Sequence, residues 1–138
     1  MDTKQDFKTK DIVSIPNHLI LVVEDDEDNQ LLLQYAISMF GWEYIFAINA
    51  LDAIKMARVK QPDIILLDIV MPNIDGFQTA SLLKNNIYTQ NIPLIAVTGL
   101  VGREEKNLIF ATGFYGYLSK PFALDDLHNA IVSNIVIN

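Results

Sequence analysis

The sequence contains no cysteine and only two histidines among its 138 residues. Disulfide bonds, thiolate metal sites and cysteine nucleophiles are therefore excluded, and neither His18 nor His128 has a partner at metal-ligand spacing. No apolar run approaches the roughly 20 residues that a membrane-spanning helix needs. The N-terminal segment also lacks the apolar core of a signal peptide. We therefore expect a cytoplasmic protein that has no membrane partner.

Basic residues are also few. Ten Lys and Arg against 17 Asp and Glu give a net charge of −7, and an acidic chain is repelled by nucleic-acid phosphates and anionic lipids. We therefore expect no nucleic-acid partner. Hydrophobic residues make up 51% of the chain, which suffices for a single buried core at this length. We predict a flexible N-terminal extension over residues 1–16 and one folded domain over residues 17–138.

Five short apolar runs alternate with five helical patterns along the predicted domain. The apolar runs are rich in β-branched residues, as strands buried on both faces are, and predict strands over 18–23, 42–48, 63–68, 93–98 and 115–119. The segments between and after them predict helices over 29–40, 50–60, 76–86, 103–113 and 124–136. Strict alternation predicts an α/β fold with a parallel sheet covered on both faces. Five units are too few for an eight-fold barrel, which leaves the open doubly wound form.

Polar residues follow four of the predicted strands. Glu24 and Asp25 follow the first strand, Asp68 ends the third, Thr98 ends the fourth, and Lys120 follows the fifth. Ligands of doubly wound sheets bind beyond the carboxyl ends of the strands, at the topological switch point. We therefore expect these five side chains to meet in one cleft.

Five consecutive carboxylates, at residues 24–28, raise the question of what compensates their repulsion. At about 4 Å and an effective dielectric near 20, each close pair costs on the order of 4 kcal/mol. A bound cation is one answer, and oxygen ligands without His or Cys favour Mg²⁺. The helix dipole is a second answer for residues 26–28, which precede or begin a predicted helix.

Mg²⁺ at this site would keep coordination positions for a phosphoryl group. Phosphoryl transfer needs mainly positioning and charge neutralisation, which Mg²⁺, Lys120 and the Thr98 hydroxyl could share. A carboxylate can act as the nucleophile and form an aspartyl-phosphate. Asp68, central in the predicted sheet, is the best-placed candidate.

The ordered motifs VVED, LLDIVMPNIDG, AVTG and YLSKPF resemble the receiver domain of bacterial response regulators over residues 19 to about 136. The thirty positions from Asp68 to Thr98 and the twenty-two from Thr98 to Lys120 are typical of receivers. The resemblance implies a flavodoxin-like sheet with strand order 2-1-3-4-5.

The resemblance also implies a chemical role for each site residue. Asp68 would accept a phosphoryl group from the phosphohistidine of a sensor histidine kinase or phosphotransfer protein. Mg²⁺ would be held by Glu24, Asp25, Asp68 and the backbone carbonyl of Val70, although many receivers have Asp where this chain has Glu24. Lys120 would pair with the phosphoryl oxygens.

Two residues are implied to act as the switch. Thr98 would move toward the phosphoryl group, and Tyr117 would then turn inward. The resemblance further implies a cis peptide bond between Lys120 and Pro121, which is rare elsewhere.

We therefore predict a stand-alone signalling regulator without an output domain, and no enzyme beyond its own aspartyl phosphorylation and dephosphorylation. It would bind a downstream protein through the last two predicted helices and the strand between them. The apolar residues of these helices are expected mostly in the core, with some of them facing a partner: Ile109, Phe110, Leu124, Leu127 and Ile131. The Ile-rich segment at 130–138 is compatible with covering the sheet or with contributing to a homodimer face.

Other functions stay open at this point. A phosphorelay intermediate or an excised receiver of a hybrid kinase would share the same site. A Mg²⁺-dependent phosphohydrolase is disfavoured because Val70 stands where such an enzyme places a second Asp. A flavin-binding protein is disfavoured because the acidic run at 24–28 would repel the flavin phosphate. A degenerate receiver with a purely structural role is the last alternative.

Overall fold

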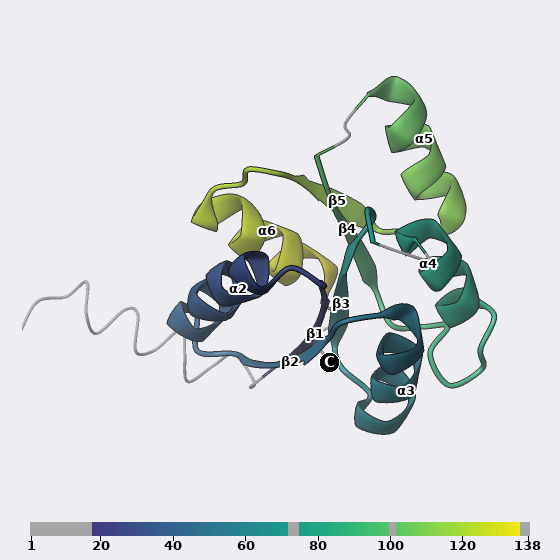
Figure 1. The fold of residues 1–138 in the computed structure, drawn as a ribbon, viewed down its shortest axis with the longest axis horizontal. Coiled ribbons are helices and arrows are strands. Elements are labelled where there is room, and N and C mark those ends of the chain that lie inside the picture. Colours follow the sequence, from purple (N-terminus) through teal and green to yellow (C-terminus); the bar gives the residue numbers. More distant parts are fainter. Residues whose placement is uncertain (1–17, 72–74, 100–101, 136–138) are drawn as a thin grey trace, which may run out of the picture.

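The computed structural model describes residues 18–71, 75–99 and 102–135. Five parallel strands form one sheet in the order β2-β1-β3-β4-β5 (Figure 1). The strands are β1 (Leu19–Val23), β2 (Glu43–Ala47), β3 (Ile64–Asp68), β4 (Leu94–Thr98) and β5 (Gly116–Ser119). The helices are α2 (Glu27–Met39), α3 (Ala50–Lys60), α4 (Gly76–Lys84), α5 (Arg103–Thr112) and α6 (Leu124–Asn134). The predicted doubly wound α/β fold and its strand order are confirmed.

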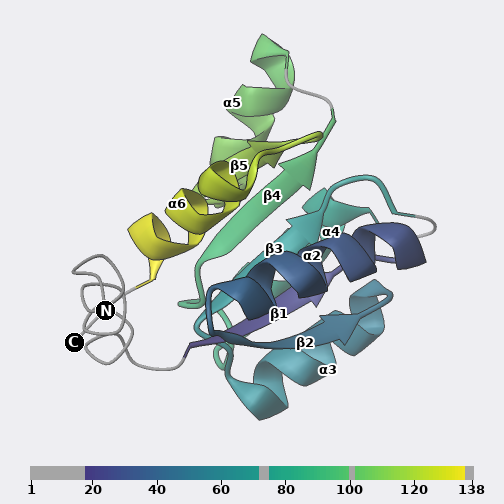
Figure 2. The ribbon, with the colours of Figure 1, turned by 90° about the vertical axis from the view of Figure 1, so that its left-hand side faces the viewer.

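The helices form two layers on the sheet. Helices α2 and α6 cover one face, and α3, α4 and α5 cover the other (Figure 1). Strands β3 and β4 are buried over their whole length, which is why their sequences are apolar up to the final residues Asp68 and Thr98. The arrowheads in Figure 2 all point the same way, so the carboxyl ends of the strands share one edge of the sheet.

The acidic run after β1 serves two separate purposes. Asp26 is the N-cap of α2, and its side chain accepts a hydrogen bond from the Asn29 amide at 3.0 Å. Glu27 and Asp28 lie in the first turn of α2, where the helix dipole favours negative charge. Helix α2 therefore begins two residues before the predicted start, and three of the five carboxylates need no metal to explain them.

Two of the five apolar residues expected mostly in the core lie at the surface. Phe110 of α5 is 52% exposed and Leu124 of α6 is 41% exposed, so these two do not belong to the core. Ile109, Leu127 and Ile131 are buried as predicted. The two exposed residues belong to amphipathic helices at one edge of the sheet, where a single narrow apolar stripe reaches the core.

The predicted extension at residues 1–16 lies outside the described residues. Within the three described ranges, none of the helices is long and apolar enough to cross a bilayer.

Candidate functional site

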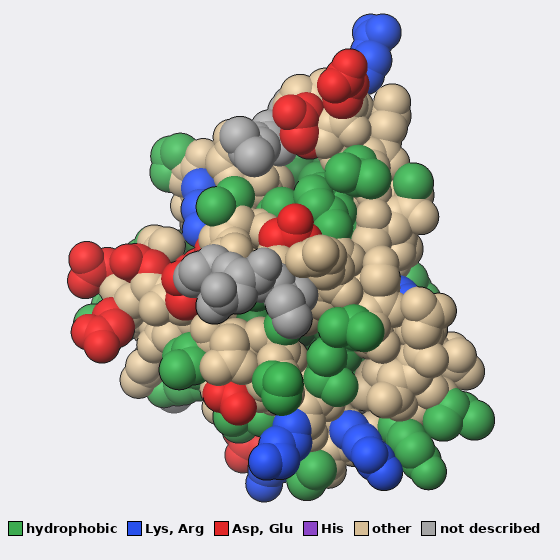
Figure 3. All heavy atoms as spheres, turned by 45° about the vertical axis from the view of Figure 1, so that its right-hand side comes forward, with side chains coloured by type: hydrophobic (Ala, Val, Ile, Leu, Met, Phe, Trp, Pro, Cys, Tyr) green, Lys and Arg blue, Asp and Glu red, His purple; other side chains and the backbone are tan. Residues whose placement is uncertain are grey.

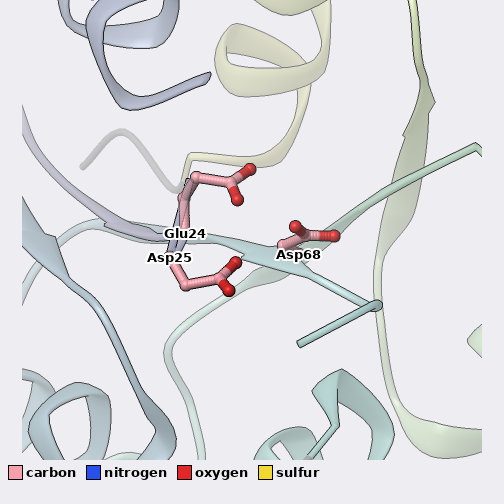
Figure 4. A group of neighbouring side chains, drawn as sticks. All are labelled: Glu24, Asp25 and Asp68. Atoms are coloured by element: carbon pink, nitrogen blue, oxygen red, sulfur yellow. The ribbon is translucent and has the colours of Figure 1, made fainter. Parts of the chain in front are cut away.

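Three carboxylates converge at the carboxyl edge of the sheet. Glu24 and Asp25 directly follow β1, and Asp68 is the last residue of the adjacent strand β3. Each offers one oxygen, and these oxygens lie within 4.8 Å of one another (Figure 4). Glu24 and Asp68 are buried, whereas Asp25 is exposed. The three carboxylates thus present clustered oxygen ligands, the donor set that suits Mg²⁺.

Lys120 supplies a positive charge at the same place. It follows β5, and its Nζ lies 3.4 Å from Glu24 Oε1 and 3.3 Å from Asp68 Oδ2. Burial lowers the pKa of the Lys120 ammonium, but the charges of Asp68 and Glu24 and their hydrogen bonds outweigh burial and raise this pKa overall. Lys120 therefore remains protonated and faces both buried carboxylates.

The pKa of the Glu24 carboxyl is raised at this site. Burial, and after it the hydrogen bond and charge of Asp68, raise this pKa from 4.5 to about 7. The amide of Asp26, which donates to Glu24 Oε2 at 3.2 Å, and the charge of Lys120 lower this pKa in part. Three carboxylates thus gather around one ammonium, and a divalent cation fits the site.

The Asp68 carboxylate is oriented by the loop that follows β3. The Val70 amide donates to Asp68 Oδ1 at 3.1 Å, while Lys120 lies at the other oxygen, Oδ2. Helix α4 begins beside this loop, and the Gly76 amide donates to the Ile69 carbonyl at 2.9 Å. A Cβ on Gly76 would stand 2.6 Å from the carbonyl oxygen of Asp68 and from Ile69 Cα. Only glycine allows α4 to approach the backbone of Asp68 this closely.

Replacing Gly76 with Ala is expected to lower the free energy of unfolding by about 2 to 4 kcal/mol, because the new methyl group meets backbone atoms that cannot rotate away. Urea unfolding followed by circular dichroism measures this change. Gly99→Ala is the matched control, since a Cβ there meets nothing within 4 Å. Equal stability of the two variants would contradict the close packing at Gly76.

Thr98 and Tyr117 lie on the neighbouring strands. Thr98 ends β4 and is buried, and its carbonyl accepts a hydrogen bond from the Lys120 amide at 2.9 Å. The half-buried Tyr117 packs on α5, with its ring centroid 6.3 Å from that of Phe110 and Lys106 Nζ 5.7 Å from the ring. The cis peptide bond between Lys120 and Pro121 is confirmed.

The structure adds two contributors that the sequence prediction did not name. Gln30 of α2 donates from Nε2 to the Glu24 carbonyl at 2.6 Å and so holds the end of β1. Gly76 permits the approach of α4 described above. Gly76 lies within the motif LLDIVMPNIDG, so its place was visible in the sequence, whereas nothing in the sequence pairs Gln30 with Glu24.

Comparison with known proteins identifies a family and several relatives. The family model described as response regulator receiver domain matches residues 20–132. The polar-differentiation response regulator DivK of Brucella anthropi is 35% identical over 105 residues, which cover 76% of this chain and 85% of the relative.

Two solved structures share the fold. The chemotaxis protein CheY4 of Vibrio cholerae is 22% identical with a TM-score of 0.82 and covers 87% of this chain and 100% of its own. The receiver domain of a sensor histidine kinase from Pseudomonas aeruginosa, described with a magnesium ion coordinated in the active site cleft, is 24% identical with a TM-score of 0.79. The match covers 86% of this chain and 98% of that domain.

Proposed function

Because the chain belongs to the response regulator receiver domain family of two-component signalling, we propose that it is a phosphorylation-dependent switch whose acceptor is Asp68. Members of this family are signalling proteins, and we propose no enzymatic activity beyond the reaction of Asp68 itself. The observation that carries the proposal is the buried Asp68 carboxylate, which has an ammonium on one oxygen and two further carboxylates beside it.

We propose that Glu24, Asp25 and Asp68, with the backbone carbonyl of Val70, hold one Mg²⁺. The clustered oxygens and the raised pKa of Glu24 support this assignment. Bound Mg²⁺ would neutralise charge on the phosphoryl oxygens. The fold shared with the Pseudomonas aeruginosa receiver, whose cleft contains magnesium, agrees with it.

The reaction balances with residues of this chain and one donor. An oxygen of Asp68 attacks the phosphorus of a phosphohistidine, the P–N bond breaks, and the imidazole nitrogen leaves with the electron pair. The product is an acyl phosphate on Asp68. The Lys120 ammonium, already 3.3 Å from Asp68 Oδ2, is positioned to pair with a phosphoryl oxygen, and the Thr98 hydroxyl is the second proposed donor.

The proposed output is a change at the α5–β5–α6 face. Thr98 and Tyr117 lie on adjacent strands, and Tyr117 contacts Phe110 of α5, so a movement of Thr98 toward the phosphoryl group has a short route to that helix. The exposed Phe110 and Leu124 give the face apolar contact area for a downstream protein. A two-state shift of this face is the proposed signal.

The surface of α2 beside the carboxylates suits the docking of a protein that donates the phosphoryl group. A cleft of about 280 Å³ lies beside the carboxylates, with Leu32, Lys120 and Phe122 among its lining residues. Leu32 and Tyr35 of α2 are 55% and 67% exposed, and they lie on the same helix that begins at the site. We propose that the histidine-containing partner docks on this side, which places its phosphohistidine near Asp68.

The double variant Leu32→Ala/Tyr35→Ala is expected to slow phosphotransfer from a phosphorylated histidine kinase by about tenfold or more, because apolar contacts at an interface centre are worth more than about 1 kcal/mol. Its reaction with acetyl phosphate, a donor too small to need the surface, is expected to stay within about twofold. Loss of radiolabel from the kinase measures the first rate. The control is Leu51→Ala/Val59→Ala, two exposed residues of α3. Equal slowing with both donors would contradict the docking assignment.

The Mg²⁺ affinity is expected to rise as pH rises through about 7. The folded protein holds a proton on Glu24 between the unfolded pKa near 4.5 and the folded pKa of about 7, so folding stability without metal falls as pH rises across that window. Mg²⁺ needs the ionised carboxylate and must displace this proton below pH 7, which weakens binding about tenfold per pH unit. Isothermal titration calorimetry at pH 6 and pH 8 measures the change.

Glu24→Gln provides the control for this pH dependence. It is expected to bind Mg²⁺ more weakly at pH 8 and to lose most of the pH dependence between 6 and 8. If wild type and variant showed the same pH dependence, Glu24 would not be the titrating ligand.

The proposed function is tested by transfer of labelled phosphate from a histidine kinase to this chain. Label on wild type that requires Mg²⁺ and is absent from an Asp68 variant would support the switch. A folded wild-type chain that accepts no label from any phosphohistidine donor or acetyl phosphate would favour the degenerate receiver.

A further inference from the structure

A second groove lies at the amino ends of β3 and β4, at the opposite edge of the sheet from the carboxylates. Its volume is about 620 Å³. This base groove runs between the end of α3 and the loop that joins α4 to β4, and its lining includes Arg58, Gln61, Asp63, Ile87, Tyr88 and Asn91. None of these residues takes part in the proposed phosphorylation switch.

One side chain holds the two walls of the base groove together. Gln61 ends α3 in the left-handed backbone conformation, with φ of 48°, which glycine adopts more readily. Its Nε2 donates to the carbonyl of Arg58 at 3.0 Å and, on the other wall, to that of Tyr88 at 2.9 Å. The Arg58 guanidinium also lies 4.8 Å from the Tyr88 ring centroid. The α3 wall and the loop wall are therefore tied to each other, so a ligand meets a preformed groove.

Large apolar side chains are exposed at both walls. Ile87 and Tyr88 of the loop are 76% and 58% exposed, and Val59, next to Arg58 at the end of α3, is 71% exposed. Single exposed apolar residues are common on protein surfaces, but these three flank one groove beside an arginine. Tyr and Arg are also the residue types that contribute most to protein interfaces. The base groove therefore has the composition of a protein-binding site.

The basic side chains of α3 have no acidic partners. Among the residues that the structure describes, Lys55, Arg58 and Lys60 are exposed, and none of the three forms an ion pair. Residues 53–62 and 76–99 together hold four Lys and Arg and no Asp or Glu, although the chain has a net charge of −7. Figure 3 shows Lys and Arg side chains at the lower edge of this face, over α3 and next to hydrophobic ones. The α3 wall is thus locally positive.

The acidic residues elsewhere in the chain do not cancel this local charge. Asp63 lines the groove, but it already accepts a hydrogen bond from the Leu19 amide at 2.7 Å and lies 3.8 Å from His18 Nδ1. The five-residue strand β3 separates the groove from Asp68 by about 17 Å. The Debye length is about 8 Å at physiological ionic strength, so charges at the two ends of the strand are largely screened from each other. A ligand in the base groove therefore meets mainly the basic side chains of α3.

The stacked guanidinium of Arg58 remains able to bind a carboxylate. Its carbon lies over the Tyr88 ring, so this contact uses the face of the planar group. The N–H donors lie in the plane and match the two oxygens of a carboxylate. The groove thus offers an apolar surface and a carboxylate-binding cation side by side.

We propose that the base groove binds an acidic segment of a partner protein. One aliphatic or aromatic side chain of this segment lies against Ile87 and Tyr88, and its carboxylates pair with Arg58 and Lys60. The groove and Asp68 lie at opposite edges of the sheet, so a protein bound in the groove leaves the phosphoryl site open. This second binding site does not depend on the proposed switch.

Selection from a phage-displayed library of random peptides, with the full chain as the target, tests the proposal. Enriched peptides are expected to carry several Asp or Glu beside one large apolar residue. Their labelled synthetic forms are then titrated with the chain by fluorescence anisotropy. The dissociation constant is expected to rise at least about tenfold in Arg58→Glu and in Ile87→Asp, because both changes remove a contact at the centre of the groove.

Arg103→Glu and Leu51→Asp are the matched controls. Both residues are exposed and lie outside the groove, and Leu51 is 71% exposed on the same helix as Arg58. These controls are expected to change the dissociation constant by less than about twofold. All four variants are expected to keep the fold by circular dichroism and to react with acetyl phosphate as wild type does, which separates this test from that of the switch.

Several results would overturn the proposal. A library that yields no enriched peptide, enriched peptides that are basic, or an affinity that neither groove variant weakens would each do so. A wild-type dimer in sedimentation velocity that Ile87→Asp dissociates would assign the groove to a second copy of the chain. Binding to phosphatidylglycerol vesicles that Arg58→Glu abolishes would assign it to a lipid surface.

Discussion

Asp68→Asn is expected to abolish the phosphoryl adduct that the wild-type protein forms with acetyl phosphate and Mg²⁺. An amide oxygen is a much weaker nucleophile than a carboxylate and cannot form a stable acyl phosphate. Asp68 is also the one carboxylate held by both the Lys120 ammonium and the Val70 amide. Intact-mass spectrometry measures the gain of one phosphoryl group.

Asp28→Asn is the matched control for this experiment. Asp28 lies in the first turn of α2 and is exposed, so its loss removes the same charge from the acidic run without touching the carboxylate cluster. This variant is expected to gain the phosphoryl group as wild type does. An adduct that persists in Asp68→Asn, with the fold intact by circular dichroism, would place the acceptor elsewhere.

Lys120→Gln is expected to slow phosphorylation by acetyl phosphate on the order of 10²-fold, because it removes the fixed cation that faces the phosphoryl oxygens. The same change is expected to tighten Mg²⁺ binding, since Lys120 lies 3.4 Å from Glu24 and 3.3 Å from Asp68 and repels a cation between them. A slower phosphorylation rate together with a higher Mg²⁺ affinity indicates the loss of the Lys120 charge, because unfolding would lower both.

Lys120→Arg controls for the charge alone. It keeps the positive charge but replaces the compact ammonium with a planar guanidinium. We expect it to retain part of the phosphorylation rate and to leave Mg²⁺ affinity near that of wild type. An unchanged rate in Lys120→Gln would show that the ammonium takes no part in the reaction.

The arrangement of the site could be predicted because parallel topology decides which residues meet. Once the runs before Glu24, Asp68, Thr98 and Lys120 were interpreted as parallel strands, their carboxyl ends had to share one edge. The apolar character of β3 and β4 made these two strands unambiguous, since both faces are covered by helices.

Other features depend on tertiary contacts that no local pattern encodes. The sequence does not show that Phe110 is one of the exposed residues of this set, because an amphipathic stripe does not reveal how much of it a sheet edge will cover. Only the structure shows which carboxylates of residues 24–28 belong to the site and which belong to the start of α2, because this depends on Asp26 being the N-cap of the helix. The raised pKa of Glu24 likewise depends on its burial beside Asp68.

Chemical mapping of the phosphoryl group tests the central claim most directly. Borohydride reduces an aspartyl-phosphate to homoserine, and peptide sequencing by mass spectrometry then locates the modified residue. After reaction of the wild-type chain with acetyl phosphate and Mg²⁺, homoserine is expected at position 68 and at no other Asp. Homoserine at another position, or phosphate retained on a hydroxyl side chain, would contradict the assignment of Asp68 as the acceptor.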